Sequence, residues 1–162
     1  MSRLNRVILV VDDDPDICWV LERLVEGLKV RCIRALDCQG ALQAARLNRL
    51  ALVLLDAKLP DMDGLELAGQ IRCADPGVPI ILISGYFYKD DRIIQAALDQ
   101  ELIYGFFEKP FSHKEIVAAI ENALSSQKVA SGAADPSAAP PLCAESLGAV
   151  HSKMDFSITT GR

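Results

Sequence analysis

Short apolar runs alternate with longer mixed segments along residues 1–126 of this 162-residue chain. The runs are too short for helices and predict strands; the continuous β-branched run at 7–11 predicts a strand buried on both faces, and the run at 30–35 is a weaker signal. In the longer segments, apolar residues recur every three or four positions, which predicts helices with one face packed on a core. The predicted strands lie at residues 7–11, 30–35, 51–55, 79–83 and 103–107, and the predicted helices at 15–28, 41–48, 65–72, 90–100 and 112–126.

This alternation predicts an α/β fold of the (βα)5 type, in which a parallel sheet lies between two layers of helices as a three-layer sandwich. Right-handed crossover connections leave few possible topologies for such a sheet. Polar residues follow the first, third, fourth and fifth strands, and they can meet only where those strands are neighbours. The doubly wound strand order 2-1-3-4-5, called flavodoxin-like, satisfies this condition.

The composition changes after residue 126. Half of residues 127–162 are Ala, Ser, Pro or Gly, and their large apolar residues follow no period. Such a segment buries too little apolar surface to offset the entropy lost on ordering. We therefore expect one domain at residues 1–126 and a low-complexity, disordered tail at 127–162. No output domain is expected after residue 126.

The overall composition argues against several classes of protein. A net charge of −5 without a basic stripe argues against direct nucleic-acid binding. The sequence has no apolar run near the ~20 residues that span a bilayer, and its start lacks the apolar core of a signal peptide. The cysteines form no zinc-binding pattern, and we expect free thiols and a cytoplasmic location. They are Cys18, Cys32, Cys38, Cys73 and Cys143.

The polar residues at the strand ends form a set with a definite chemistry. Asp12 and Asp13 follow the first predicted strand, Asp56 the third, Ser84 the fourth and Lys109 the fifth. Three neighbouring carboxylates repel one another unless a cation lies between them, and Mg²⁺ prefers such oxygen ligands. An ammonium and a hydroxyl group can contact phosphoryl oxygens. Together these groups favour phosphoryl transfer through an aspartyl-phosphate, with magnesium as cofactor.

Four sequence motifs at these strand ends resemble the receiver domain of two-component response regulators. They are Val-Val-Asp-Asp-Asp-Pro at 10–15, Lys-Leu-Pro-Asp-Met-Asp-Gly at 58–64 after Asp56, Ile-Ser-Gly at 83–85 and Glu-Lys-Pro-Phe at 108–111. Each motif alone is a weak signal, but the four in this order are specific. The resemblance covers about residues 5–126.

The resemblance implies roles for the acidic residues and their neighbours. Asp56 would accept a phosphoryl group from a sensor histidine kinase or a phosphotransfer protein. Asp13 and Asp56 would bind Mg²⁺ directly, and Asp12 would bind it mainly through water. The backbone carbonyl of Lys58 would supply a further oxygen ligand.

The resemblance also implies how the domain signals. Lys109 would pair with the phosphoryl group, Ser84 would move to hydrogen-bond it, and the ring of Phe106 would swing inward behind Ser84. The Lys109–Pro110 peptide bond is expected to be cis. The surface formed by residues 90–100, 103–107 and 112–126 would then be read by a downstream protein, or by a second copy in a phosphorylation-dependent homodimer. The chain would be a signalling switch and not an enzyme.

Two other interpretations stay open. A haloacid-dehalogenase-like phosphatase also uses an aspartyl-phosphate and Mg²⁺, but its nucleophile would be Asp12, and Asp16 stands where Thr or Val belongs. A pseudo-receiver would be a binding module that is never phosphorylated. The complete set of acids and Lys109 count against that interpretation.

Overall fold

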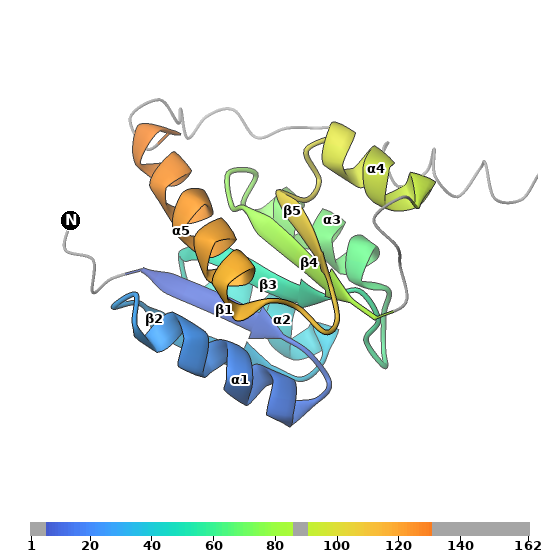
Figure 1. Cartoon of the computed structure of the whole chain (residues 1–162). Coiled ribbons are helices and arrows are strands. Elements are labelled where there is room, and N and C mark those ends of the chain that lie inside the picture. Colours follow the sequence, from blue (N-terminus) through green and yellow to red (C-terminus); the bar gives the residue numbers. More distant parts are fainter. Residues whose placement is uncertain (1–5, 86–90, 131–162) are drawn as a thin grey trace, which may run out of the picture.

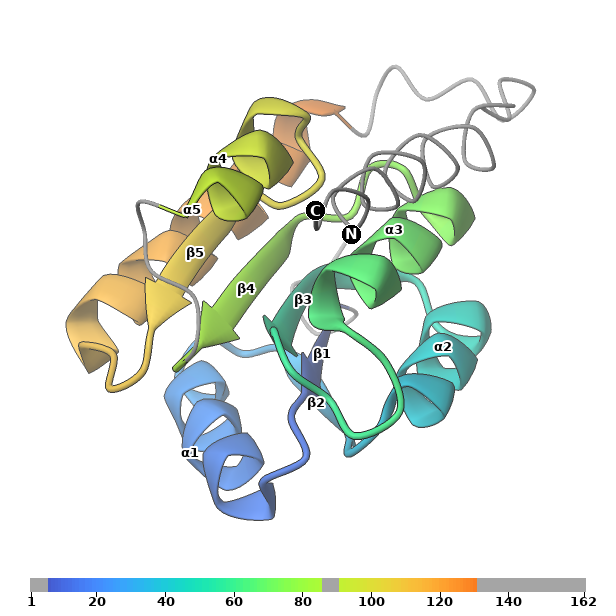
Figure 2. The same ribbon diagram turned by 90° about the vertical axis from the view of Figure 1, so that its right-hand side faces the viewer.

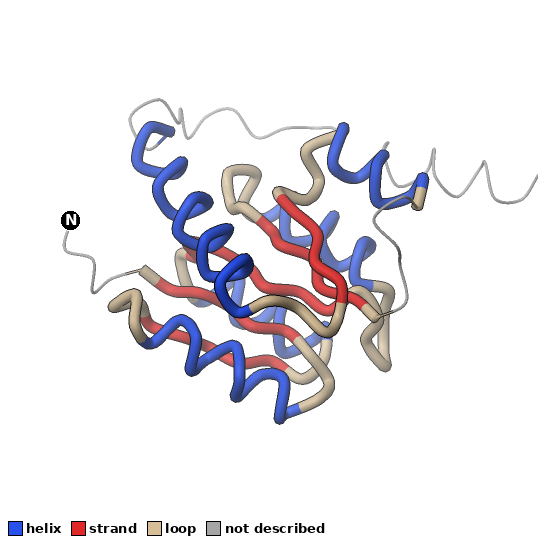
Figure 3. The backbone as a smooth tube through the Cα atoms, in the orientation of Figure 1, coloured by secondary structure: helices blue, strands red, loops and turns tan. Residues whose placement is uncertain are grey.

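A computed structural model describes residues 6–85 and 91–130 of the chain (Figure 1). In this part of the chain, strands and helices alternate strictly (Figure 3). The strands are β1 (Val7–Val11), β2 (Arg31–Ala35), β3 (Leu50–Asp56), β4 (Ile80–Ser84) and β5 (Gly105–Glu108). The helices are α1 (Pro15–Glu26), α2 (Cys38–Leu47), α3 (Gly64–Ala74), α4 (Arg92–Asp99) and α5 (His113–Ala130).

The strands form one parallel sheet in the order β2-β1-β3-β4-β5, as predicted. The arrowheads of the strands therefore point to the same edge of the sheet in Figure 1. The register aligns the strand ends closely, because Val11 pairs with Leu55, and Ser84 pairs with Glu108. Residues that follow β1, β3, β4 and β5 consequently meet at the carboxyl edge.

Helices cover both faces of the sheet, and each face has its own hydrophobic core (Figure 2). α1 and α5 pack on one face, and α2, α3 and α4 pack on the other. The central strands β1, β3 and β4 are buried along their whole length. Strands buried on both faces explain why these runs are continuously apolar and do not alternate.

The observed elements differ from the predicted ones mainly at their ends. α2 begins at Cys38, three residues earlier than predicted, because the side chain of Asp37 caps it by accepting from the N–H of Gly40. β5 begins at Gly105, two residues later than predicted, because the N–H of Ile103 bonds to the carbonyl of Ala97 in α4. The described helices include none with the length and apolarity that a bilayer crossing requires.

The division into a domain and a tail stays a prediction. α5 continues to Ala130, four residues past the expected boundary at residue 126. Residues 131–162 lie outside the described part of the chain. The start of the predicted helix 90–100 also lies partly outside it, and α4 begins after its capping residue Asp91.

The expectation of free thiols holds for three of the cysteines and is wrong for one. Cys18, Cys32 and Cys38 are free, and burial raises the pKa of Cys18 to about 11 and those of the other two to about 12. These thiols are therefore un-ionised and unreactive near neutral pH. Cys73 is disulfide-bonded. Cys143 lies outside the described residues.

Candidate functional site

The carboxyl edge of the sheet brings together side chains that are far apart in the sequence. Asp12 directly follows β1, Asp56 is the last residue of β3, and Ser84 is the last residue of β4. Lys109 directly follows β5, and its backbone N–H donates to the carbonyl of Ser84 at 2.9 Å. The Lys109–Pro110 peptide bond is cis, as the resemblance implies.

Three carboxylates at this edge form a cluster. One oxygen from each of Asp12, Asp13 and Asp56 lies within 4.8 Å of the other two. Asp12 and Asp56 are buried, and Asp13 is exposed. Such a cluster of oxygen donors fits a hard divalent cation such as Mg²⁺, which binds carboxylates and keeps several waters. The acidic residues predicted to hold the metal thus lie close enough together to share one ion.

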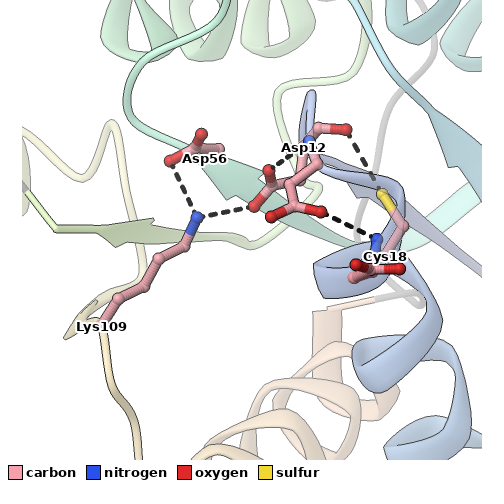
Figure 4. A network of polar contacts seen from close by, with 6 residues as sticks. Asp12, Cys18, Asp56 and Lys109 are labelled. Carbon is pink, nitrogen blue, oxygen red and sulfur yellow. Dashed lines mark hydrogen bonds and ion pairs between the residues drawn. The ribbon is translucent and has the colours of Figure 1, made fainter.

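Lys109 brings a positive charge into contact with this cluster. Its Nζ lies 2.7 Å from Oδ2 of Asp12 and 3.5 Å from Oδ1 of Asp56, so it reaches between the two carboxylates (Figure 4). Burial alone would lower the pKa of Lys109. The hydrogen bond to Asp12 and the charges of Asp12 and Asp56 outweigh this effect and raise the pKa. Lys109 therefore stays charged over the whole physiological range.

The pKa of Asp56 is raised above its ordinary value. Burial is the main cause, and the negative charge of Asp12 adds to it. Lys109 and the backbone N–H of Lys58, which donates to the Asp56 carboxylate, lower the pKa but do not cancel the increase. The folded chain therefore destabilises the ionised form of Asp56 relative to the protonated form. A bound cation would stabilise the ionised form.

Ser84 and Phe106, the two predicted switch residues, lie on the neighbouring strands β4 and β5. Ser84 is wholly buried, and Phe106 is only 7% exposed. Phe106 belongs to the hydrophobic core between the sheet and α2, α3 and α4. The swing of its ring on phosphorylation, which the resemblance implies, stays a prediction.

The loop between β3 and α3 is fixed next to Asp56. The backbone of Lys58 pairs with that of Asp63 in an isolated antiparallel bridge, and the side chain of Leu59 is buried. The N–H of Gly64 donates to the carbonyl of Ala57 at 2.8 Å. A Cβ on Gly64 would lie 2.4 Å from the carbonyl oxygen of Asp56, so only glycine fits there.

Two contacts of the site were not predicted from the sequence. The thiol of Cys18 donates to the backbone carbonyl of Asp12 at 3.4 Å (Figure 4). The side chain of Asp61, in the loop between β3 and α3, accepts from the backbone N–H of Cys38. Neither contact has a local sequence signal, because each joins segments whose distance depends on the folded packing.

Comparison with known proteins identifies clear relatives of this arrangement. The family described as "Response regulator receiver domain" matches residues 8–121. The DNA-binding transcriptional regulator NtrC of Escherichia coli K12 is 33% identical over 119 residues, which are 74% of this chain and 25% of NtrC. The chain thus spans about a quarter of that relative.

Two of the similar solved structures match this chain over almost their whole length. A CheY-like response regulator receiver domain protein from Methanospirillum hungatei has a TM-score of 0.70 at 25% identity, over 76% of this chain and 96% of that one. The response regulator TrrA of Thermotoga maritima, solved in complex with Mg²⁺ and BeF, has a TM-score of 0.63 at 27% identity. That match covers 73% of this chain and 98% of TrrA.

Proposed function

The chain belongs to the response-regulator receiver family, and from this premise we propose that it is a phosphorylation-dependent switch whose acceptor is Asp56. Receiver domains are signalling switches of two-component systems. The observation that carries the proposal is the placement of buried Asp56 beside Asp12, Asp13 and the ammonium of Lys109. This is the set of groups that phosphoryl transfer to a carboxylate needs.

The acidic cluster is proposed to hold Mg²⁺. Asp13 and Asp56 would bind the ion directly, Asp12 mainly through water, and Lys58 through its backbone carbonyl. When bound, the ion supplies positive charge that offsets the carboxylates and the phosphoryl oxygens. The proximity of the three carboxylates and the raised pKa of Asp56 support this assignment.

Asp56, Lys109 and Ser84 would have different roles in the phosphoryl transfer. A carboxylate oxygen of Asp56 attacks the phosphorus of a phosphohistidine, so that an O–P bond forms while the N–P bond to histidine breaks. The ammonium of Lys109 neutralises a phosphoryl oxygen, and the hydroxyl of Ser84 donates a hydrogen bond to another. The domain would catalyse only this reaction and the later hydrolysis of its own aspartyl-phosphate.

The partners are part of the same proposal. The phosphoryl donor would be a sensor histidine kinase or a phosphotransfer protein in the cytoplasm. The face of α4, β5 and α5 would carry the signal to a downstream protein or to a second phosphorylated copy. Large apolar side chains exposed near this face support a role in binding, namely Ile93 on α4 (46% exposed) and Tyr104 before β5 (43% exposed). Phe106 and Ser84 would link that face to Asp56.

The proposal can be tested by phosphorylating the chain with a small donor. Wild type incubated with Mg²⁺ and acetyl phosphate is expected to gain the mass of one phosphoryl group. Asp56→Asn should gain none, because an amide oxygen is a poor nucleophile. Asp16→Asn is the matched control: it removes an exposed acid in the first turn of α1 and should leave incorporation unchanged.

The same experiment separates the alternative functions. A label on Asp12 would contradict the proposal and favour a haloacid-dehalogenase-like phosphatase. A folded wild-type chain that binds Mg²⁺ but is never labelled would favour a pseudo-receiver.

A further inference from the structure

Asp61 lies in the loop between β3 and α3, but its side chain contacts a different element. Its Oδ1 and Oδ2 accept from the backbone N–H of Cys38 at 3.1 and 3.0 Å. Cys38 is the first residue of α2, whose first N–H groups have no partner within the helix. This hydrogen bond is the main cause that lowers the pKa of Asp61 below its ordinary value. The carboxylate is therefore ionised, as suits the positive end of a helix dipole.

The contact is more than a helix cap, because α2 already has one. Asp37, directly before the helix, accepts from the N–H of Gly40 at 2.7 Å. Two exposed aspartates thus cap the same helix end, one from the adjacent residue and one from a loop 23 positions after Cys38. Of these two bonds, the one from Asp61 joins α2 to a loop far from it in the sequence, whereas the one from Asp37 is local.

The loop that Asp61 anchors also carries the backbone of Lys58. The N–H of Lys58 donates to the Asp56 carboxylate, and Lys58 pairs with Asp63 across the loop. Asp61 lies between these two paired residues, at the tip of the loop. The bridge fixes the base of the loop, and the bond to Cys38 fixes its tip.

We propose that Asp61 is a positioning residue, which holds the β3–α3 loop against α2 so that the backbone of Lys58 stays directed at Asp56. This inference rests on the proposed function, since it concerns the carbonyl of Lys58 as a Mg²⁺ ligand. Groups that orient a metal site from outside affect affinity strongly, although they never touch the metal. Loss of the bond frees the loop tip and lets the carbonyl of Lys58 turn away from the acidic cluster.

Asp37 provides a matched control for the test. Asp61→Ala and Asp37→Ala each remove one exposed carboxylate cap from the same helix end, so both should lower the melting temperature to a similar extent. Only Asp61→Ala releases the loop. Asp61→Asn removes the charge of the side chain but keeps an oxygen that can accept from Cys38.

The measured quantities are the Mg²⁺ dissociation constant by titration calorimetry and the rate of labelling by acetyl phosphate. Asp61→Ala should weaken Mg²⁺ binding about tenfold, the change that corresponds to a lost cap. Asp61→Asn should stay within about threefold of wild type, and Asp37→Ala should bind Mg²⁺ as wild type does. Labelling rates at subsaturating Mg²⁺ should follow the same order.

Three results would overturn the inference: wild-type Mg²⁺ affinity in Asp61→Ala, equal losses in Asp61→Ala and Asp37→Ala, or equal losses in Asp61→Ala and Asp61→Asn. The second would show a general loosening of α2, and the third an effect of charge alone. A wild-type chain that neither binds Mg²⁺ nor becomes labelled would instead contradict the proposed function, and the inference would fall with it.

Discussion

The two edges of the sheet carry their charges in opposite ways. At the carboxyl edge, Asp12 and Asp56 are buried, and they share the ammonium of a lysine. At the amino edge, where the strands begin, Lys29, Arg31 and Arg49 are exposed to water, and Arg72 is partly buried. Charges in water cost little, whereas buried charges stabilise a protein only when well paired.

The hollows of the surface also differ between the edges. Two hollows of about 380 and 560 Å³ open near the amino ends of the strands, one beside Arg6 and the other beside Arg72. The residues that line them include none of the candidate site. These hollows therefore do not coincide with the candidate site, which is marked instead by its buried charged groups.

The largest effect is expected from removing the shared cation. Lys109→Met leaves the carboxylates of Asp12 and Asp56 buried without a counter-charge and should lower the free energy of unfolding by about 3 kcal/mol without Mg²⁺. At the amino edge, Arg49→Met should change it by less than about 0.5 kcal/mol. Urea denaturation of both variants measures the contrast, and equal losses would show that the two edges do not differ.

A smaller effect is expected from adding one methyl group at each edge. Gly64→Ala places a Cβ against the carbonyl of Asp56 and should cost about 2 kcal/mol, as overpacking does. Gly27, after α1, has an ordinary helical φ of −63° and open space around its Cβ position. Gly27→Ala should therefore stabilise the chain by about 0.5 kcal/mol through the unfolded state. Thermal denaturation compares the two, and a tolerated Gly64→Ala would refute the tight packing of the loop.

The smallest change in stability is expected from removing the charge of Asp56. Its folded-state pKa lies above the unfolded value near 3.9, so the folded chain binds the proton more tightly. Stability of the metal-free chain should thus fall as the pH rises from the unfolded pKa through the raised folded pKa. Asp56→Asn removes this cost and should stabilise the metal-free chain by about 1 kcal/mol at neutral pH.

Mg²⁺ provides the control for that prediction. At 100 times its dissociation constant, Mg²⁺ should stabilise wild type by about 2.7 kcal/mol. Wild type should then be more stable than Asp56→Asn, the reverse of the order without metal. Denaturation at several pH values, with and without Mg²⁺, measures both effects. If Asp56→Asn is still more stable than wild type below pH 4, the difference in the free energy of unfolding has a cause other than the ionisation of Asp56.

The fold could be predicted because its signals are local. The continuously apolar runs at 7–11, 51–55 and 79–83 became the three central strands, with bounds within one residue of those expected. The predicted ends of helices and strands were wrong where a tertiary contact determines the end of the element. The start of β5 depends on the bond between Ile103 and Ala97, which no period in the sequence reveals.

The candidate site was predictable to the level of which residues meet. Parallel strands gather their carboxyl ends, so the positions of Asp12, Asp56 and Lys109 after their strands determined the cluster. No pattern in the sequence indicates that Lys109 lies nearer to Asp12 than to Asp56, since that depends on the exact reach of one flexible side chain. The bond between Asp61 and Cys38 was also not predictable, because it requires α2 and the β3–α3 loop to be packed together.

The charge balance of the acidic cluster limits how the switch can signal. Three ionised carboxylates and one ammonium give −3 + 1 = −2, which a single divalent ion neutralises. If Asp56 is phosphorylated as proposed, the acyl phosphate would replace a carboxylate that is already negative, so its nearly two charges would add only about one to the total. A serine or threonine phosphorylated in the same way would change by the full amount. Under the proposed function, a partner of this domain would therefore respond to rearranged shape at the surface more than to a change in the net charge of the domain.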